Sequence, residues 1–105
     1  MNNINFVFVT TNNKKEGQSL AKEMVKKRLA ACVSILPNMR SIYEWDGEIQ
    51  DEEEYLLIIK TTAERIEDLK YFISKNHSYE VPEFVVFESI DALPDYLDWI
   101  NKITS

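Results

Sequence analysis

The 105-residue sequence contains 1 cysteine, 1 histidine, 2 glycines and 3 prolines, and it has no long apolar run. A single cysteine, Cys32, cannot form a disulfide within the chain, which favours a reducing compartment such as the cytoplasm. No apolar stretch approaches the roughly 18–20 residues that a membrane-spanning helix needs. The short apolar run near the N-terminus lacks preceding basic residues and is predicted to be a strand, not a secretory signal. We therefore expect a cytoplasmic protein with no membrane partner.

Positive charge is also scarce, because 12 Lys and Arg residues face 18 Asp and Glu residues, for a net charge of −6. Phosphate backbones repel such a chain, so we expect no nucleic-acid partner. The sequence has no Gly-rich phosphate loop, no CxxC motif and no nucleophile–base pair that its single histidine would serve. These absences favour a protein that is not an enzyme and requires no cofactor.

The remaining composition is that of an ordinary globular protein, with 45% hydrophobic residues and a length that suits one domain spanning residues 1–105. The apolar residues change several times between a period of two and a helical period, and these changes mark the elements. Strands are predicted at 4–10, 30–36, 40–45, 48–60 and 84–90, and helices at about 14–28, 62–76 and 95–103.

Each of the first two predicted helices begins at a capping box, in which two side chains reciprocally satisfy free backbone amides. The pairs are Asn13 with Glu16 and Thr61 with Glu64. An apolar stripe at the helical period is expected to face the sheet from each helix. The stripes comprise Gly17, Leu20, Ala21, Met24 and Val25 in the first helix and Ala63, Ile66, Leu69 and Ile73 in the second.

Asp46-Gly47 is the strongest turn signal, because Gly adopts a positive φ without steric cost and Asp tolerates it. It predicts a long hairpin whose second arm ends in the apolar segment 55–61, which is typical of a central strand. The order β-α-β-β-α-β predicts an α+β, ferredoxin-like sandwich. In this fold one antiparallel sheet carries two helices on one face, here with a long hairpin and a short C-terminal helix.

Both faces of this predicted sheet are apolar, because neighbouring residues on a strand point to opposite faces. Phe6 and Phe8 oppose Val7 and Val9, Leu56 and Ile58 oppose Leu57 and Ile59, and Phe84 and Val86 oppose Val85 and Phe87. Two helices cover only one face, and a large exposed apolar patch is unusual on a soluble monomer. We therefore expect an obligate homo-oligomer. The alternative is a monomer whose C-terminal helix shields the second face.

Five segments resemble, in order and spacing, the CutA (divalent-cation tolerance) family. They are KRLAACVSILP at 27–37, SIYEWDGEI at 41–49, YLLIIKTT at 55–62, YEVPE at 79–83 and YLDWI at 96–100. The match runs from about Phe6 to Ile103. The resemblance implies a ferredoxin-like subunit in a tight homotrimer similar to the PII signalling proteins, with long hairpins pairing across subunits. It also implies a role in the response to divalent metal ions, with copper binding.

The sequence departs from the family pattern in the loop around its histidine. The usual HPYEVPE segment reads His77-Ser78-Tyr79 at its start here, so the loop is expected to be less rigid. Two copper ligands proposed in some members, a cysteine and a second histidine, correspond to Val9 and Asn76. A copper site built from those ligands is therefore absent.

The resemblance implies that Lys60, His77, Tyr79 and Glu83 lie near a cleft between subunits, where they would bind a small charged ligand. The alternative for Lys60 and Glu83 is an exposed ion pair, which contributes little. His77 and Cys32 are the candidate ligands for copper or another divalent cation, although neither belongs to a full ligand set. The alternatives are a histidine bonded to backbone and an inert buried thiol.

The acidic segment 48–54 either collects divalent cations loosely or, as we favour, forms a solvated hairpin arm. Tyr43, Trp45 and Trp99 are predicted to anchor interfaces and core, not to stack nucleic-acid bases.

Three functions stay open at this point. The leading one is a homotrimeric, non-enzymatic ion- or ligand-binding or signalling scaffold with sites between subunits. The second is an enzyme whose active site assembles between subunits from His77, Lys60 and Glu83. The third is a structural oligomer that binds partner proteins.

Overall fold

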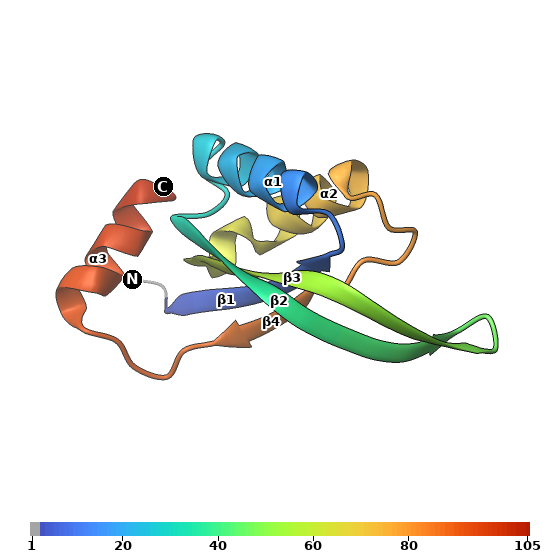
Figure 1. Ribbon diagram of the computed structural model, residues 1–105. Helices are drawn as coiled ribbons and strands as arrows, with labels where there is room; N and C mark the ends of the chain where they lie inside the picture. The colour runs from blue at the N-terminus through green and yellow to red at the C-terminus, as the bar shows by residue number, and fades with distance from the viewer. Residues whose placement is uncertain (1–2) are drawn as a thin grey trace.

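The computed structural model describes residues 3–105 and contains one antiparallel sheet with three α-helices. Its elements are β1 Ile4–Thr11, α1 Lys14–Lys26, β2 Cys32–Trp45, β3 Glu48–Thr62, the 3-10 turn Ala63–Arg65, α2 Ile66–Asn76, β4 Val85–Glu88 and α3 Pro94–Ile103. The strand order is β2-β3-β1-β4, and α1 and α2 lie on the same face of the sheet (Figure 1). The predicted α+β, ferredoxin-like fold is confirmed, with β3 in a central position.

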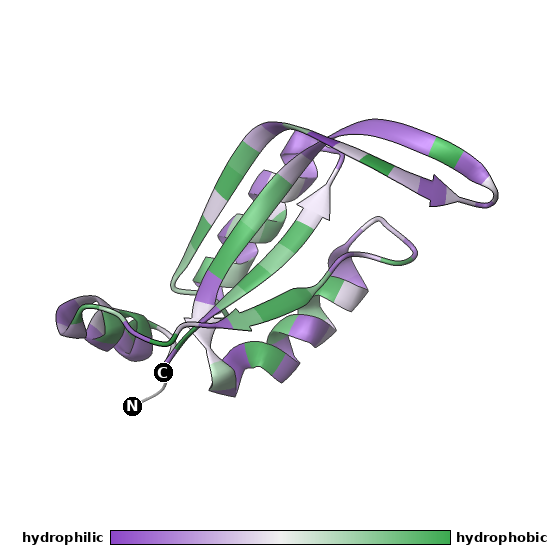
Figure 2. Ribbon diagram, turned by 90° about the horizontal axis from the view of Figure 1, so that it is seen from below, coloured by the Kyte–Doolittle hydropathy of each residue, from purple (hydrophilic) through white to green (hydrophobic). Residues whose placement is uncertain are grey.

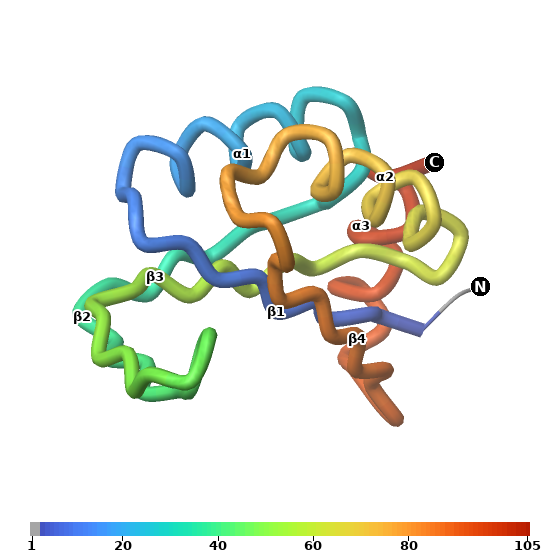
Figure 3. Tube along the Cα trace, turned by 90° about the vertical axis from the view of Figure 1, so that its right-hand side faces the viewer, coloured from blue at the N-terminus to red at the C-terminus, as the bar shows by residue number. Residues whose placement is uncertain are grey.

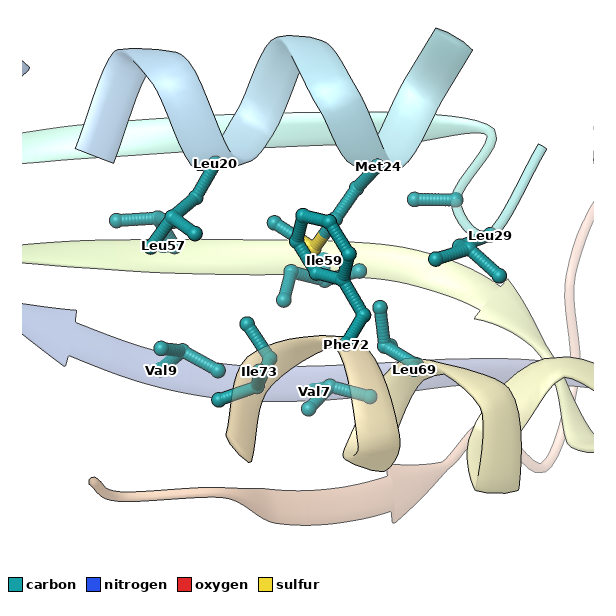
Figure 4. Packing of buried hydrophobic residues seen from close by; sticks show 11 residues of the cluster. Val7, Val9, Leu20, Met24, Leu29, Leu57, Ile59, Leu69, Phe72 and Ile73 are labelled. Atoms are coloured by element: carbon teal, nitrogen blue, oxygen red, sulfur yellow. The ribbon is translucent and has the colours of Figure 1, made fainter. Parts of the chain in front are cut away.

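The main core lies between α1, α2 and the sheet (Figure 4). Val7, Val9, Leu57 and Ile59 are fully buried and point toward the helices, as the alternation of side chains predicted. The helices contribute Leu20, Met24, Leu69, Phe72 and Ile73. A Cβ atom at Gly17 would lie 3.2 Å from Thr11 Cγ2 and 3.5 Å from Leu57 Cδ1, so the glycine allows α1 to lie close to the sheet.

The helix starts differ in part from the predicted capping boxes. Asn13 accepts the predicted bond from the Glu16 amide at 3.0 Å, but the Glu16 carboxylate is bonded elsewhere and does not complete the box. The prediction for Thr61 is wrong, because its hydroxyl donates to the Leu29 carbonyl at 2.7 Å and the chain makes a 3-10 turn before α2.

Two residues assigned to the buried stripes are exposed. Val25 is 42% exposed, and Ala63 lies in the exposed 3-10 turn. Val25 stands at the edge of its stripe, where a small rotation of the helix moves a side chain from the core to solvent. Ala63 is exposed because it precedes α2, which begins at Ile66.

The hairpin of β2 and β3 projects far beyond the rest of the sheet (Figure 1). Asp46 and Gly47 have φ angles of 52° and 79°, which confirms the predicted turn. The strands predicted separately at 30–36 and 40–45 form one strand, because β2 continues through Pro37-Asn38 with a register shift between Leu36 and Met39. Such a bulge absorbs the proline and lets pairing resume.

The second face of the sheet has no helical layer, and we call it the bare face (Figures 2 and 3). It is lined by Phe6, Phe8, Cys32, Ser34, Leu36, Leu56, Ile58, Val85 and Phe87, which the strand register places on one side. Phe87 is 50% exposed and Leu36 is 45% exposed. The bare face is therefore largely apolar and only partly shielded by its own chain.

The C-terminal helix α3 shields only one end of this face. Its Ile100 packs with Ile4 and Ala31, and Phe6 joins this small cluster, so α3 covers the bare face only at its Ile4–Phe6 end. Figure 1 shows α3 at the end of the sheet opposite the hairpin tip. In this chain, the tail helix therefore leaves most of the apolar surface uncovered, contrary to what the monomer alternative requires.

Candidate functional site

The loop between α2 and β4 holds three of the four residues that the resemblance placed in a ligand cleft. His77 begins the loop and is 9% exposed. Its Nε2 lies 2.7 Å from the Thr10 carbonyl oxygen, and the Tyr79 amide donates to its Nδ1 at 3.0 Å. Nε2 therefore carries the proton, and both ring nitrogens bond to backbone. A metal ion at His77 would have to displace one of these bonds.

Tyr79 reaches from the loop to the base of the hairpin. Its hydroxyl donates to the Glu54 carboxylate at 2.5 Å, and Glu54 is only 4% exposed. Burial, reinforced by this hydrogen bond, raises the pKa of Tyr79 far above its usual value. Burial also raises the pKa of Glu83, and the nearby charge of Glu54 acts in the same direction. Glu54 of β3 and Glu83 of the loop thus lie close together, and neither belongs to an ion pair among residues 3–105.

A hollow of about 690 Å³ lies between this loop and the hairpin. It is lined by Thr10, Asn12, Ser41, Ile42, Tyr43, Trp45, Gln50, Glu52, Glu54, Tyr79, Glu80, Val81 and Glu83. On its hairpin side, the Tyr43 hydroxyl donates to Glu52 at 2.7 Å. An acidic, aromatic hollow of this kind suits a positively charged group.

Sequence reasoning missed Glu54, which it left within a solvated acidic arm. One signal was available in the sequence. Glu54 stands an even number of residues before Leu56, Ile58 and Lys60 on the same strand, so its side chain points to the bare face as theirs do. Glu54 is buried there because Tyr79 folds over it.

Lys60 lies apart from the other predicted site residues within the chain. It stands six positions after Glu54 along β3, which corresponds to about 20 Å at the usual rise of a strand. Its Nζ lies 3.1 Å from Ser34 Oγ and 3.8 Å from Cys32 Sγ. The structure brings His77, Tyr79 and Glu83 to one end of the bare face, and Lys60 with Cys32 to the other.

No metal centre forms within the described part of one chain. Among residues 3–105, no group of three or more His, Cys, Asp or Glu side chains is arranged to hold a metal ion. The two predicted ligands, His77 and Cys32, lie at opposite ends of the bare face.

Glu16 of α1 ties the loop to the helical layer. Its carboxylate accepts bonds from the Thr11 hydroxyl and from both the amide and the hydroxyl of Ser78, at 2.9 Å and 3.0 Å respectively. A proline at position 78 would have no amide N–H to donate. Ser78 thus holds the loop through hydrogen bonds, at the point where the departure from the family motif predicted less rigidity.

We expect Glu16→Gln to loosen this loop and to lower stability by less than about 1 kcal/mol at pH 7, since the carboxylate is partly exposed. Burial alone would raise the pKa of Glu16, but the bonds from Thr11 and Ser78 outweigh it and lower the pKa below 4.5. The stabilisation is therefore present above pH 4.5 and is lost as the pH falls through the lowered pKa. Urea unfolding at pH 7 and pH 3 measures this, with Glu23→Gln as control. An equal deficit at both pH values would contradict the assignment.

Comparison with known proteins identifies the family. The sequence model of the family described as CutA1 divalent ion tolerance protein matches residues 5–103. The chain belongs to the CutA1 family. The sequence is 41% identical over 98 residues to the chloroplastic CutA protein of Arabidopsis thaliana, covering 93% of this chain but only 54% of the relative. The chain thus spans about half of that relative's length.

Other CutA proteins match over nearly their whole length. The divalent-cation tolerance protein CutA of Thermus thermophilus is 39% identical over 98 residues, covering 93% of this chain and 95% of the relative. The solved structure described as the periplasmic divalent cation tolerance protein CutA of Archaeoglobus fulgidus superposes with a TM-score of 0.93 at 31% identity, covering 97% of this chain and 99% of that one.

The family resemblance drawn from the five motifs is therefore confirmed. The names of CutA relatives place them in different compartments, since one is chloroplastic and another periplasmic. Within residues 3–105, no helix of this chain has both the length and the apolar character needed to span a bilayer.

Proposed function

We propose that this chain is the subunit of a non-enzymatic homotrimer that acts in divalent-cation tolerance and binds an ion or a small charged ligand between its subunits. The bare face is the observation that carries the proposal. At about 25 cal/mol per Å², leaving about 400 Å² of apolar surface in water would forfeit on the order of 10 kcal/mol. Further copies of the chain are the simplest cover, because each brings the same apolar face.

The placement of the acidic hollow supports the second part of the proposal. Glu54, Tyr79 and Glu83 stand at one end of the bare face, so a subunit that covers the face also borders the hollow. Copper or another divalent cation is the proposed ligand, in keeping with the CutA relatives named for divalent-cation tolerance. We propose a reducing compartment such as the cytoplasm, where the free thiol of Cys32 would persist.

Sedimentation and calorimetry together test this function. We expect a stable trimer at micromolar concentration, and saturable binding of Cu(II), or of Cu(I) under reductant, that exceeds the binding by a generic acidic protein. His77→Ala and Cys32→Ser then locate the bound ion. A stable monomer would refute the assembly, and copper binding no tighter than that of the acidic control would refute the metal ligand.

The enzyme alternative keeps one structural argument, because Glu83 has a raised pKa and borders a hollow. His77 weakens it, since both ring nitrogens bond to backbone and leave no free base. Any activity found with the purified chain should be retained by Glu83→Ala if the alternative is wrong.

A further inference from the structure

Half of the chain's 12 Lys and Arg residues lie between positions 14 and 28, although the whole chain has a net charge of −6. Within this segment only Glu16 and Glu23 are acidic, and the Glu16 carboxylate is bonded to Thr11 and Ser78. The basic side chains are all exposed, and they are those of Lys14, Lys15, Lys22, Lys26, Lys27 and Arg28. An acidic protein thus has a positive surface along α1, which the proposed function does not use.

Three of these residues, Lys15, Lys22 and Lys26, form a single line on α1, and we call them the lysine row. They lie within about 40° of one another around the helix axis and extend for about 16 Å along it. The α1 residues that are buried against the sheet lie on the opposite side of the helix. Because α1 lies on the face of the sheet opposite the bare face, the row points away from the bare face (Figure 1).

The lysine row opposes the formation of the helix that carries it. Lys22 and Lys26 stand four residues apart, where like charges repel and destabilise a helix. Lys15 lies in the first turn of α1, where the helix dipole disfavours a positive charge. No ion pair among residues 3–105 includes an α1 side chain, so Glu23 does not offset these costs. Charges that oppose local structure without compensation within the fold indicate a role in binding.

We propose that the lysine row docks an acidic α-helix of another protein. Two helices that lie side by side have the same rise per residue, so carboxylates spaced by seven and four residues would oppose the three lysines in register. Each pairing would be a charge-assisted hydrogen bond between an ammonium and a carboxylate. Gln18 and Ser19 border the row and are exposed, so they offer neutral hydrogen-bonding groups beside it. The inference goes beyond the proposed ligand site and does not depend on the oligomeric state.

Two other polyanions fit the lysine row less well. A helix that binds a membrane surface buries its apolar face in the lipid, whereas the apolar face of α1 is buried against the sheet. Single-stranded nucleic acid gains affinity by stacking its bases on aromatic side chains, and α1 contains no aromatic residue. A row one lysine wide instead matches the narrow line of carboxylates on one face of a helix.

Fluorescence anisotropy with a synthetic helix tests the docking. The probe is an alanine- and glutamine-based helical peptide whose glutamates are spaced by seven and four residues, and the comparison peptide has the same composition with its glutamates on different faces. At about 50 mM salt, where surface charges are weakly screened, we expect the triple variant Lys15→Gln, Lys22→Gln and Lys26→Gln to bind the probe about 10-fold more weakly than the wild type. The wild type should also bind the probe more tightly than the comparison peptide.

A charge-matched control separates the lysine row from net charge. Lys70→Gln, Lys75→Gln and Lys102→Gln together remove the same charge from exposed positions outside α1, and this variant should bind the probe within about 2-fold of the wild type. An equal loss in the control, or equal binding of the two peptides, would overturn the inference. Anionic vesicles or a single-stranded oligonucleotide that bound the row more tightly than the probe would overturn the choice of partner.

Urea unfolding distinguishes a binding role from a structural one. Because the lysine row opposes the formation of α1, removal of its charges should leave the unfolding midpoint equal to or above that of the wild type. A midpoint lowered by more than that of the control variant would assign the lysines to the fold and overturn the inference. A chain that sediments as a monomer would refute the proposed trimer but would leave both tests of the row unchanged.

Discussion

Replacing Phe8 by Asp is expected to convert the proposed trimer into monomers. Phe8 lies in the middle of the bare face, beside Ile58 on β3, and its ring is 4.9 Å from that of Phe87. A carboxylate there would lose its hydration on assembly without gaining a partner, at a cost of about 2 kcal/mol or more per interface. Because side chains of the helix face are unaffected, each released subunit should keep its secondary structure.

Sedimentation velocity across a range of concentrations measures this change, and circular dichroism checks that the variant is folded. The matched control is Val25→Asp, which places the same charge on the outer surface of α1, where the side chain is 42% exposed. If Phe8→Asp sediments like the wild type, the bare face is not the contact surface.

Leu57→Ala is expected to give the largest loss of folding stability, about 2–5 kcal/mol. Leu57 is fully buried among the residues of the main core, and a Cβ at Gly17 would lie 3.5 Å from its Cδ1, so α1 packs directly on it. Truncation removes these contacts and leaves a cavity that the tightly packed helix and sheet fill only in part.

Urea unfolding at one fixed protein concentration measures the loss, since association adds to the apparent stability. Val25→Ala is the control at an exposed helical position and should change stability by less than about 0.5 kcal/mol. A change at Leu57 as small as that of the control would mean that the core is not packed as described.

The fold was predictable because its signals are local and repeated. Alternation in β1 and β3 assigned Val7, Val9, Leu57 and Ile59 to one face, and all four are fully buried. Asp46-Gly47 located the turn of the hairpin without any knowledge of the rest. Such patterns follow from backbone geometry, so they can be recognised without knowing which residues pack around them.

The predictions that were wrong required knowledge of distant neighbours. Thr61 matches a capping residue in sequence, but the Leu29 carbonyl lies within its reach and takes its hydroxyl instead. Glu16 could equally close a capping box, yet Thr11 and Ser78 supply competing donors. Local propensity cannot rank these partners, because Leu29 and Ser78 are brought close only by the tertiary fold.

The sequence predicted which residues belong to the candidate site better than it predicted how they are arranged. Family resemblance named His77, Tyr79 and Glu83, which share one loop and therefore stay together. It could not show that both ring nitrogens of His77 form hydrogen bonds with backbone groups. Nor could it find Glu54, whose burial depends on a tyrosine 25 residues further along the chain.

The long hairpin has a consequence for how this protein becomes ordered. From Glu48 to Glu54, β3 pairs with β2 alone, and Ile42 and Ile49 near the tip are 70% and 71% exposed. A two-stranded ribbon without a covering layer is at best marginally stable in water. In the proposed trimer, the outer arm should therefore fluctuate in a freshly synthesised subunit and become rigid only when subunits dock. Ordering of the arm would then depend on the cellular concentration of the chain.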